Sequence, residues 1–177
     1  MIQIPIPNNS YAFLNFITEE ERLELKDWVI GLYKRNKLKP NTTEGRFWNM
    51  VSYKRLGEEA IPLFYDIKLR IMEQENYTKD NMSEHLNDFI SLGLPGSSIH
   101  QHTDPNRENH IHTRYNLIVN KAEQGGQPVY NGSIIEYDNS MLWRCEAGKY
   151  LHSTTPVQGN EYRINISYGF QVPINEC

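Results

Sequence analysis

The sequence has few cysteines and no long apolar segment. Its 177 residues include two cysteines, Cys145 and Cys177, which cannot supply a disulfide framework or, unaided, a zinc-finger site. The first residues show neither the basic region nor the long apolar run of a secretory signal. We therefore expect a cytoplasmic protein. Because no apolar run approaches the length of a membrane span, we expect no membrane partner.

The sequence also lacks an excess of positive charge. Its 18 lysines and arginines are outnumbered by 22 acidic residues, and the net charge is −4. Nucleic-acid binding generally requires clustered basic side chains, so a nucleic-acid partner is not expected. Hydrophobic residues make up 38% and charged residues 23% of the chain, as in an ordinary globular protein. The length suffices for one domain with its own core, while the composition indicates no oligomeric state.

The first part of the chain carries helical patterns. The segment Thr18–Glu21 has the spacing of a capping box, and the apolar residues that follow it predict a helix ending near Arg35. A second helix is expected from about Glu58 to Glu75, because its apolar residues recur at helical spacing. We interpret residues 1–80 as a helical support region.

The second part carries the pattern of short strands separated by turns. Residues 81–177 are expected to form the β core of a single domain that spans residues 1–177. Two or three helices and seven or eight strands predict a mainly β, α+β fold, in which helices pack on one sheet of a double-sheet β-roll. A β-sandwich of another type is the alternative. The expected strands are His85–Leu92, Ser97–His102, Arg114–Val119, Pro128–Tyr130, Ser133–Tyr137, Met141–Cys145, Leu151–Pro156 and Tyr162–Val172.

Three residues are candidate metal ligands. In His102-Thr103-Asp104, the histidine and the aspartate share one side of an extended segment, because side chains alternate. His152 follows 50 residues later. Two histidines and one carboxylate form the facial triad of non-haem Fe(II) oxygenases, which leaves positions open for a cosubstrate and O2. The triplet alone is a weak signal, since 6 histidines and 22 acidic residues produce one by chance in roughly half of such sequences.

The surroundings of these residues resemble a known family. From Leu94 to Val172 the chain looks like the Fe(II)- and 2-oxoglutarate-dependent oxygenases, especially their small prolyl-hydroxylase-like group. Pro95–Ile99 resembles the lead-in to the family's His-x-Asp motif, Lys121–Gly126 resembles its Glu-Gly-Gly turn, and His152–Gly159 resembles its distal-histidine segment. The resemblance implies a double-stranded β-helix (jelly-roll, cupin-like) with two or three N-terminal helices packed on one sheet. It also implies Fe(II), with 2-oxoglutarate and O2 as cosubstrates.

The same resemblance indicates residues for cosubstrate binding. Arg163 stands where the family places a basic residue, and a guanidinium can pair with the distal carboxylate of 2-oxoglutarate. Many arginine-bearing members have serine two residues later, where this chain has Asn165, and Ser167 follows on the same strand face. On the strand after the triad, Asn116 or Tyr115 is expected to face the cosubstrate. Asn116 is favoured, because Tyr115 alternates with apolar residues.

No motif identifies the substrate. Arg107, in the loop after Asp104, and Trp48, in an irregular segment, are candidates for contacting a peptide side chain or a small molecule. His110 and His112 are interpreted as solvated loop residues.

Three functions are compatible with these observations. The leading one is a hydroxylase that acts on an unactivated C–H bond and releases succinate and CO2. The second is a nucleobase-demethylating dioxygenase, since Arg163–Ser167 resembles the Arg-x-Asn-x-Thr strand of that branch, although the acidic charge and the lack of a basic, aromatic lid argue against it. The third is a non-catalytic, cupin-like metal-binding module, favoured if His102, Asp104 and His152 do not converge.

Overall fold

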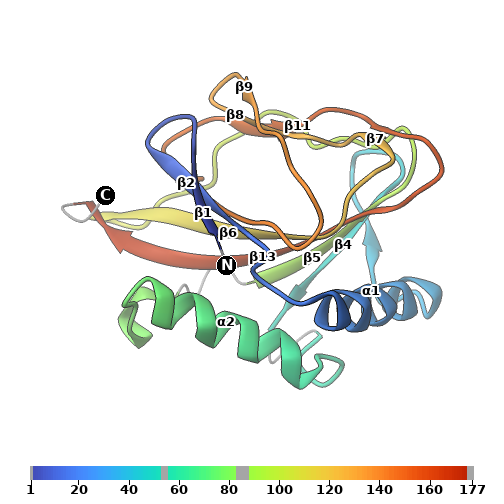
Figure 1. The fold of residues 1–177 in the computed structure, drawn as a ribbon, viewed down its shortest axis with the longest axis horizontal. Helices are drawn as coiled ribbons and strands as arrows, with labels where there is room; N and C mark the ends of the chain where they lie inside the picture. Colours follow the sequence, from blue (N-terminus) through green and yellow to red (C-terminus); the bar gives the residue numbers. More distant parts are fainter. Residues whose placement is uncertain (1, 53–55, 83–87, 175–177) are drawn as a thin grey trace.

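A large antiparallel sheet forms the centre of the protein, between two helices on one side and two small sheets on the other (Figure 1). The computed structural model describes residues 2–52, 56–82 and 88–174. The large sheet has the order β1-β2-β10-β6-β13-β5-β4-β3, and the small sheets are β11-β8-β9 and β12-β7. This arrangement confirms the expected mainly β fold with helices on one sheet. The strands are β1 (Ile2–Ile6), β2 (Ser10–Leu14), β3 (Lys39–Pro40), β4 (Arg46–Val51), β5 (Asp88–Gly93), β6 (His110–Asn120), β7 (Gln124–Gly125), β8 (Pro128–Tyr130), β9 (Ser133–Ile134), β10 (Leu142–Cys145), β11 (His152–Thr154), β12 (Val157–Gln158) and β13 (Arg163–Pro173).

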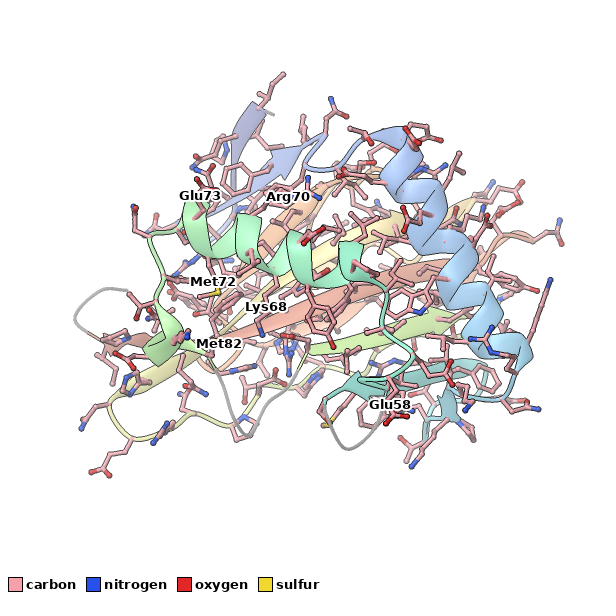
Figure 2. The ribbon with its side chains drawn as sticks, turned by 90° about the horizontal axis from the view of Figure 1, so that it is seen from below. Glu58, Lys68, Arg70, Met72, Glu73 and Met82 are labelled. Carbon is pink, nitrogen blue, oxygen red and sulfur yellow. The ribbon has the colours of Figure 1, made fainter. Side chains whose placement is uncertain are left out.

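The helices begin and end close to the expected positions. Helix α1 spans Glu19–Lys34, and its capping box is formed: the Thr18 hydroxyl accepts from the amide of Glu21, whose carboxylate accepts from the Thr18 amide. Helix α2 spans Pro62–Gln74 and starts later than expected, at the proline in its first turn. A short 3-10 helix, η1, covers Lys79–Asn81. Figure 2 shows α1 and α2 lying across the same face of the large sheet.

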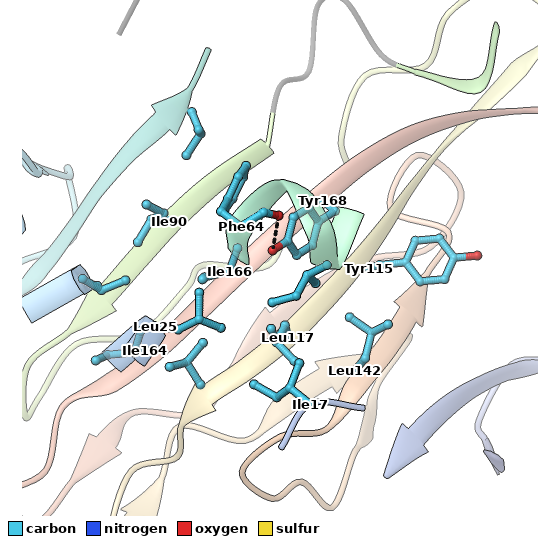
Figure 3. Packing of buried hydrophobic residues seen from close by; sticks show 14 of the residues in the cluster. Ile17, Leu25, Phe64, Ile90, Tyr115, Leu117, Leu142, Ile164, Ile166 and Tyr168 are labelled. Carbon is cyan, nitrogen blue, oxygen red and sulfur yellow. Dashed lines mark hydrogen bonds between the residues drawn. The ribbon is translucent and has the colours of Figure 1, made fainter. Parts of the chain in front are cut away.

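The main apolar core fills the space between these helices and the sheet. Ile164, Ile166 and Tyr168 of β13 alternate toward the helices and pack with Phe64 of α2 (Figure 3). The Tyr168 hydroxyl donates to the backbone carbonyl of Phe64 at 3.2 Å, which satisfies a polar group inside the core. The pairing of β13 with β6 shifts register between Ile164 and Asn165, as in a β-bulge.

The first 80 residues contribute strands as well as helices, so the expectation of a purely helical support region is incomplete. The hairpin of β1 and β2 turns at Asn8 and Asn9, whose φ angles of 66° and 54° match a tight hairpin turn, and β2 pairs with β10. Strand β4 pairs with β5 along its whole length. The pairing of β1 with β2 is local, but β2 with β10 and β4 with β5 join segments far apart in the chain, so no local pattern revealed those two pairings.

Several expected strands differ in extent or kind. The strands expected over Ser133–Tyr137 and Leu151–Pro156 are shorter, as β9 and β11. The strand expected over His85–Leu92 is seen as β5, while residues 85–87 lie outside the described residues. The segment Ser97–His102 is not a strand. It bonds to the chain around β11 through separate contacts, such as the amide of Thr154 to the carbonyl of Ile99, and not through a continuous ladder. Within the described ranges, no helix is both long and apolar enough to cross a membrane.

Candidate metal centre

The three predicted ligands meet where two separate segments are bridged. The amide of His102 donates to the carbonyl of His152 at 3.1 Å, and the reverse bond measures 2.9 Å. The amide of Asp104 is held by the carbonyl of Ala147 at 2.8 Å. One ligand atom each of His102, Asp104 and His152 lies within 4.8 Å of the others. The three residues therefore converge, which was the condition separating a metal site from three unrelated side chains.

Both imidazoles are oriented by backbone carbonyls. Nδ1 of His102 lies 2.7 Å from the carbonyl oxygen of His100, and Nδ1 of His152 lies 3.3 Å from that of Tyr150. A carbonyl only accepts, so Nδ1 carries the proton in each ring and Nε2 keeps its lone pair. The two Nε2 atoms lie 3.5 and 4.0 Å from Oδ1 of Asp104. Three donor atoms thus face one small volume.

The carboxylate of Asp104 is divided between two directions. Its Oδ1 faces the two imidazoles, while its Oδ2 accepts from Nε of Arg114 at 2.5 Å. Burial alone would raise the pKa of this carboxyl, but hydrogen bonding to His102 and the charge of Arg114 outweigh burial and hold the pKa well below its usual range. Asp104 is therefore an anion with one oxygen free to bind a cation.

The pKa values of the histidines at the site are shifted in different directions. Hydrogen bonding to Asp104 raises the pKa of His102, while burial and the neighbouring His102 lower the pKa of His152. The interpretation of His112 as a solvated loop residue is wrong, because β6 begins at His110 and turns His112 inward. His112 is fully buried with Nε2 3.4 Å from Asp104, and burial followed by the charge of Arg114 lowers its pKa to about 3.

A pocket of about 250 Å³ opens beside the three ligands, and we call it the triad pocket. Besides them, it is lined by polar residues and by an apolar wall. The polar residues are Asn41, Arg46, Arg114, Asn116, Ser153, Thr154, Arg163 and Asn165, and the apolar wall consists of Trp48, Met50, Phe89, Ile99 and Trp143. Four of the residues predicted to bind cosubstrate or substrate thus line this pocket: Asn116, Asn165, Arg163 and Trp48.

Three other predicted residues lie outside the lining. Tyr115 faces the helices, fully buried, with its hydroxyl 3.1 Å from that of Tyr77, so its assignment to the cosubstrate is wrong. Ser167 shares the strand face of Arg163 but is buried beneath Nη1 of Arg114 at 3.5 Å. Arg107 is exposed in the loop after the triad and does not line the pocket.

Arg163 is fixed at its Nε and open at its end. Nε donates to the carbonyl of Gly126 at 2.7 Å, and no carboxylate among the described residues pairs with the guanidinium. A Cβ at position 126 would lie 2.9 Å from Cδ of Arg163, and φ there is +64°, so only glycine fits this turn. Burial lowers the pKa of Arg163, though an arginine remains a cation. The guanidinium is available to an anionic ligand.

The site fits an iron ion and a polar organic ligand. Two imidazole nitrogens and one carboxylate oxygen, with no thiolate, form the donor set that non-haem Fe(II) prefers. Oδ1 of Asn165 and Nε1 of Trp143, both from residues lining the pocket, are buried without a hydrogen-bond partner among the described residues. Buried polar atoms are normally satisfied, so these two atoms indicate that a ligand completes the pocket.

Sequence reasoning missed Arg46, His112 and Arg114. The one signal for the latter two is strand alternation, because His112, Arg114 and Asn116 form one face of β6. Arg46 had no such signal, since the strand that carries it is recognisable only through its pairing with β5.

The protein resembles known proteins in its structure and not detectably in its sequence. No protein-family model and no curated protein matches the sequence. A prolyl-4-hydroxylase from Pseudomonas putida superposes with a TM-score of 0.63 at 16% identity, over 91% of each chain. A prolyl hydroxylase from Trichoplax adhaerens, solved with a hypoxia-inducible-factor peptide, gives 0.71 at 14%, over 96% of this chain and 86% of the other. HygX from Streptomyces hygroscopicus, with nickel and 2-oxoglutarate bound, gives 0.71 at 8%, over 93% and 83%. The chain therefore has the fold of the prolyl-hydroxylase-like 2-oxoglutarate oxygenases, a double-stranded β-helix, as expected.

Proposed function

We propose that this protein is an Fe(II)- and 2-oxoglutarate-dependent dioxygenase that hydroxylates an unactivated C–H bond of a small molecule or a peptide side chain. The observation that carries the proposal is the convergence of His102, Asp104 and His152 within 4.8 Å, beside a pocket that Arg163 also lines. We further propose that residues 1–177 form one domain in the cytoplasm.

Each group of residues has a distinct task in this proposal. His102, Asp104 and His152 hold the metal, and iron with 2-oxoglutarate and O2 supplies the oxidising chemistry, which yields succinate and CO2. Arg163 pairs with the distal carboxylate of 2-oxoglutarate through its free nitrogens. Asn116 and Asn165, linked by a 3.4 Å hydrogen bond, offer amide groups to the same ligand.

The structural neighbours support both the cosubstrate and the range of substrates. HygX holds nickel and 2-oxoglutarate on the same fold, and the Trichoplax enzyme holds a peptide. The apolar wall, with Trp48 and Phe89, excludes water from one side of the pocket and offers contact to the carbon skeleton of a substrate.

Metal and cosubstrate binding can be tested without knowing the substrate. Calorimetry under argon is expected to show one Mn(II) per chain and 2-oxoglutarate binding that depends on the metal. With Fe(II) and O2, the protein is expected to form succinate slowly on its own and faster with a compound found by screening. A protein that binds Mn(II) but not 2-oxoglutarate would instead be a metal-binding module, and the proposal would fail.

A further inference from the structure

The triad pocket contains more positive charge than its proposed ligands need. Three arginines line it, Arg46, Arg114 and Arg163, but among the described residues Asp104 is the one carboxylate that does. Arg114 is paired with Asp104, and Arg163 is assigned to the cosubstrate. Among the residues that the structure describes, Arg46 has a single polar side-chain contact, from its Nε to the hydroxyl of Ser91 at 3.3 Å, and no carboxylate of these residues pairs with it.

The charge of the loaded site stays unbalanced. The one negative charge of Asp104 and the two of 2-oxoglutarate offset a divalent ion and one arginine, so two arginines are left over. A charge withdrawn from water is costly unless an opposite charge compensates it. An additional ligand group that accepts hydrogen bonds and carries negative charge would compensate the guanidinium of Arg46.

The sheet places Arg46 beside Arg163 but on a different strand. Gly93 of β5 pairs with Arg46 of β4 on one side and with Arg163 of β13 on the other, so the two arginines lie in one row across the sheet. Burial, and then the charge of Arg163, lower the pKa of Arg46 to about 10, so it is still a cation at neutral pH. The next inward residues of β4, Trp48 and Met50, belong to the apolar wall.

Arg46 shares the triad pocket with the most exposed of the three ligands. The side chain of His102 is 44% exposed, against 14% for His152 and 13% for Asp104, so solvent reaches the triad past His102. Arg46 and His102 both line the triad pocket. A substrate in this pocket has within reach both Arg46 and the ring of Trp48, two residues along the same strand.

We propose that the substrate carries a carboxylate that pairs with Arg46, next to an apolar part that packs against Trp48. The inference rests on the proposed function, because it treats Arg163 as occupied by 2-oxoglutarate. It narrows the substrate class to acids, whether a small carboxylic acid or a peptide with an acidic residue at the site.

Matched acid and amide probes test this inference. The protein is loaded with Mn(II) and 2-oxoglutarate without O2, and binding is followed by paramagnetic broadening of the probe's proton signals, with Zn(II)-loaded protein as the reference. The probes are 3-phenylpropanoate and N-acetyl-L-phenylalanine, each against its primary amide. The variants are Arg46→Gln, Arg46→Lys and, as matched control, Lys39→Gln. Lys39 is an exposed cation on β3, which pairs with β4 but does not line the pocket.

In the parent and in Lys39→Gln, the acids are expected to bind at least about tenfold more tightly than the amides. In Arg46→Gln, the affinities for acid and amide should differ by no more than about twofold. Arg46→Lys should keep part of the preference. The affinity for 2-oxoglutarate should stay within about threefold in every variant, and this also shows that each is folded.

Four results would overturn the inference. They are equal binding of acids and amides by the parent, no binding of any acid, an acid preference that survives in Arg46→Gln, and a loss of 2-oxoglutarate affinity in Arg46→Gln as large as that in Arg163→Leu. The last would assign Arg46 to the cosubstrate. A parent that binds neither Mn(II) nor 2-oxoglutarate would instead overturn the proposed function.

Discussion

The two faces of β6 and β13 are equally buried and chemically opposite. Toward the helices, β13 presents Ile164, Ile166 and Tyr168, which belong to the main apolar core. Toward the triad pocket it presents Arg163 and Asn165, and both are also buried. Burial by itself therefore does not distinguish a stabilising residue from a functional one in this sheet.

The difference lies in how many polar groups each face carries. The helix face carries few: the Tyr168 hydroxyl has a protein partner, and the Thr113 hydroxyl has none among the described residues. The pocket face carries guanidinium, imidazole and amide groups, and some of their atoms have no partner among the described residues. Unsatisfied buried polar groups cost about 1–3 kcal/mol each, so the pocket face is retained against stability. Substitutions on the two faces should consequently affect different measurements.

The largest effect is expected from removing a metal ligand. His152→Ala should abolish metal-dependent succinate formation and most Mn(II) binding, while thermal stability without metal changes little, because the ring belongs to the pocket face. His100→Ala is the matched control, since its exposed ring holds no ligand and only its carbonyl orients His102. Undiminished Mn(II) affinity and turnover in His152→Ala would refute the assignment.

The next effect concerns the cosubstrate. Arg163→Leu should bind Mn(II) like the parent but bind 2-oxoglutarate about two to three orders of magnitude more weakly, because losing one partner of a buried charge pair costs about 3–5 kcal/mol. Arg163→Lys should retain only part of the affinity for 2-oxoglutarate, since lysine keeps the positive charge but lacks the planar guanidinium. Calorimetry on Mn(II)-loaded protein measures both. Equal affinities in parent and leucine variant would make Arg163 a structural residue.

A substitution on the helix face should act on stability alone. Leu117 on β6 is fully buried in the main core, and Leu117→Ala should lower the free energy of unfolding by about 2–5 kcal/mol through the cavity it leaves. Mn(II) affinity of the folded protein should not change. Leu69→Ala, on the exposed side of α2, should cost less than about 0.5 kcal/mol. Urea unfolding measures both, and a Leu117→Ala variant that lost metal binding while folded would show that the faces are coupled.

The smallest effect is a pH dependence on the helix face. Burial, and then the neighbouring Tyr77 and Glu75, hold the pKa of Tyr115 well above 10. The folded state therefore keeps a proton that the unfolded state loses, so this contribution is intact below about pH 10 and declines above it by up to about 1.4 kcal/mol per pH unit. Tyr115→Phe should make the fall in unfolding free energy above pH 10 shallower. Tyr65→Phe, at an exposed phenol on α2, is the control, and identical slopes in parent and Tyr115→Phe would contradict the prediction.

Features encoded within a few residues could be predicted from the sequence. The capping box of Thr18 depends on contacts three residues apart, and the structure forms it as expected. The triplet of His102 and Asp104 and the later His152 were identified by motif and by family resemblance, and they converge. The preference for Asn116 over Tyr115 followed from strand alternation, and the structure places Asn116 at the pocket and Tyr115 in the core.

Features that depend on distant pairing could not be predicted. The interpretation of His112 was wrong because it depends on where β6 begins. The strand starts at His110, before the expected Arg114, and therefore includes His112 with its side chain pointing inward. Arg46 reaches the pocket only because β4 pairs with β5, about forty residues away in sequence. Alternation places Phe47 and Trp48 on opposite faces of β4. Because both residues are aromatic, the sequence does not show which face of β4 packs in the core, and only the register of its pairing decides this.

The register shift between Ile164 and Asn165 has a consequence for how this protein can evolve. Because side chains alternate, inserting or deleting one residue in β13 would exchange its faces, moving isoleucines to the metal and an arginine under the helices. Such length changes are therefore tolerated along this strand only where a bulge absorbs the extra residue, as the register shift at Ile164 and Asn165 does. Loops such as the one that contains Arg107 change length at lower cost. New substrates are therefore acquired more readily by point substitution within the pocket or by loop insertion around it than by altering the length of the strand that carries Arg163.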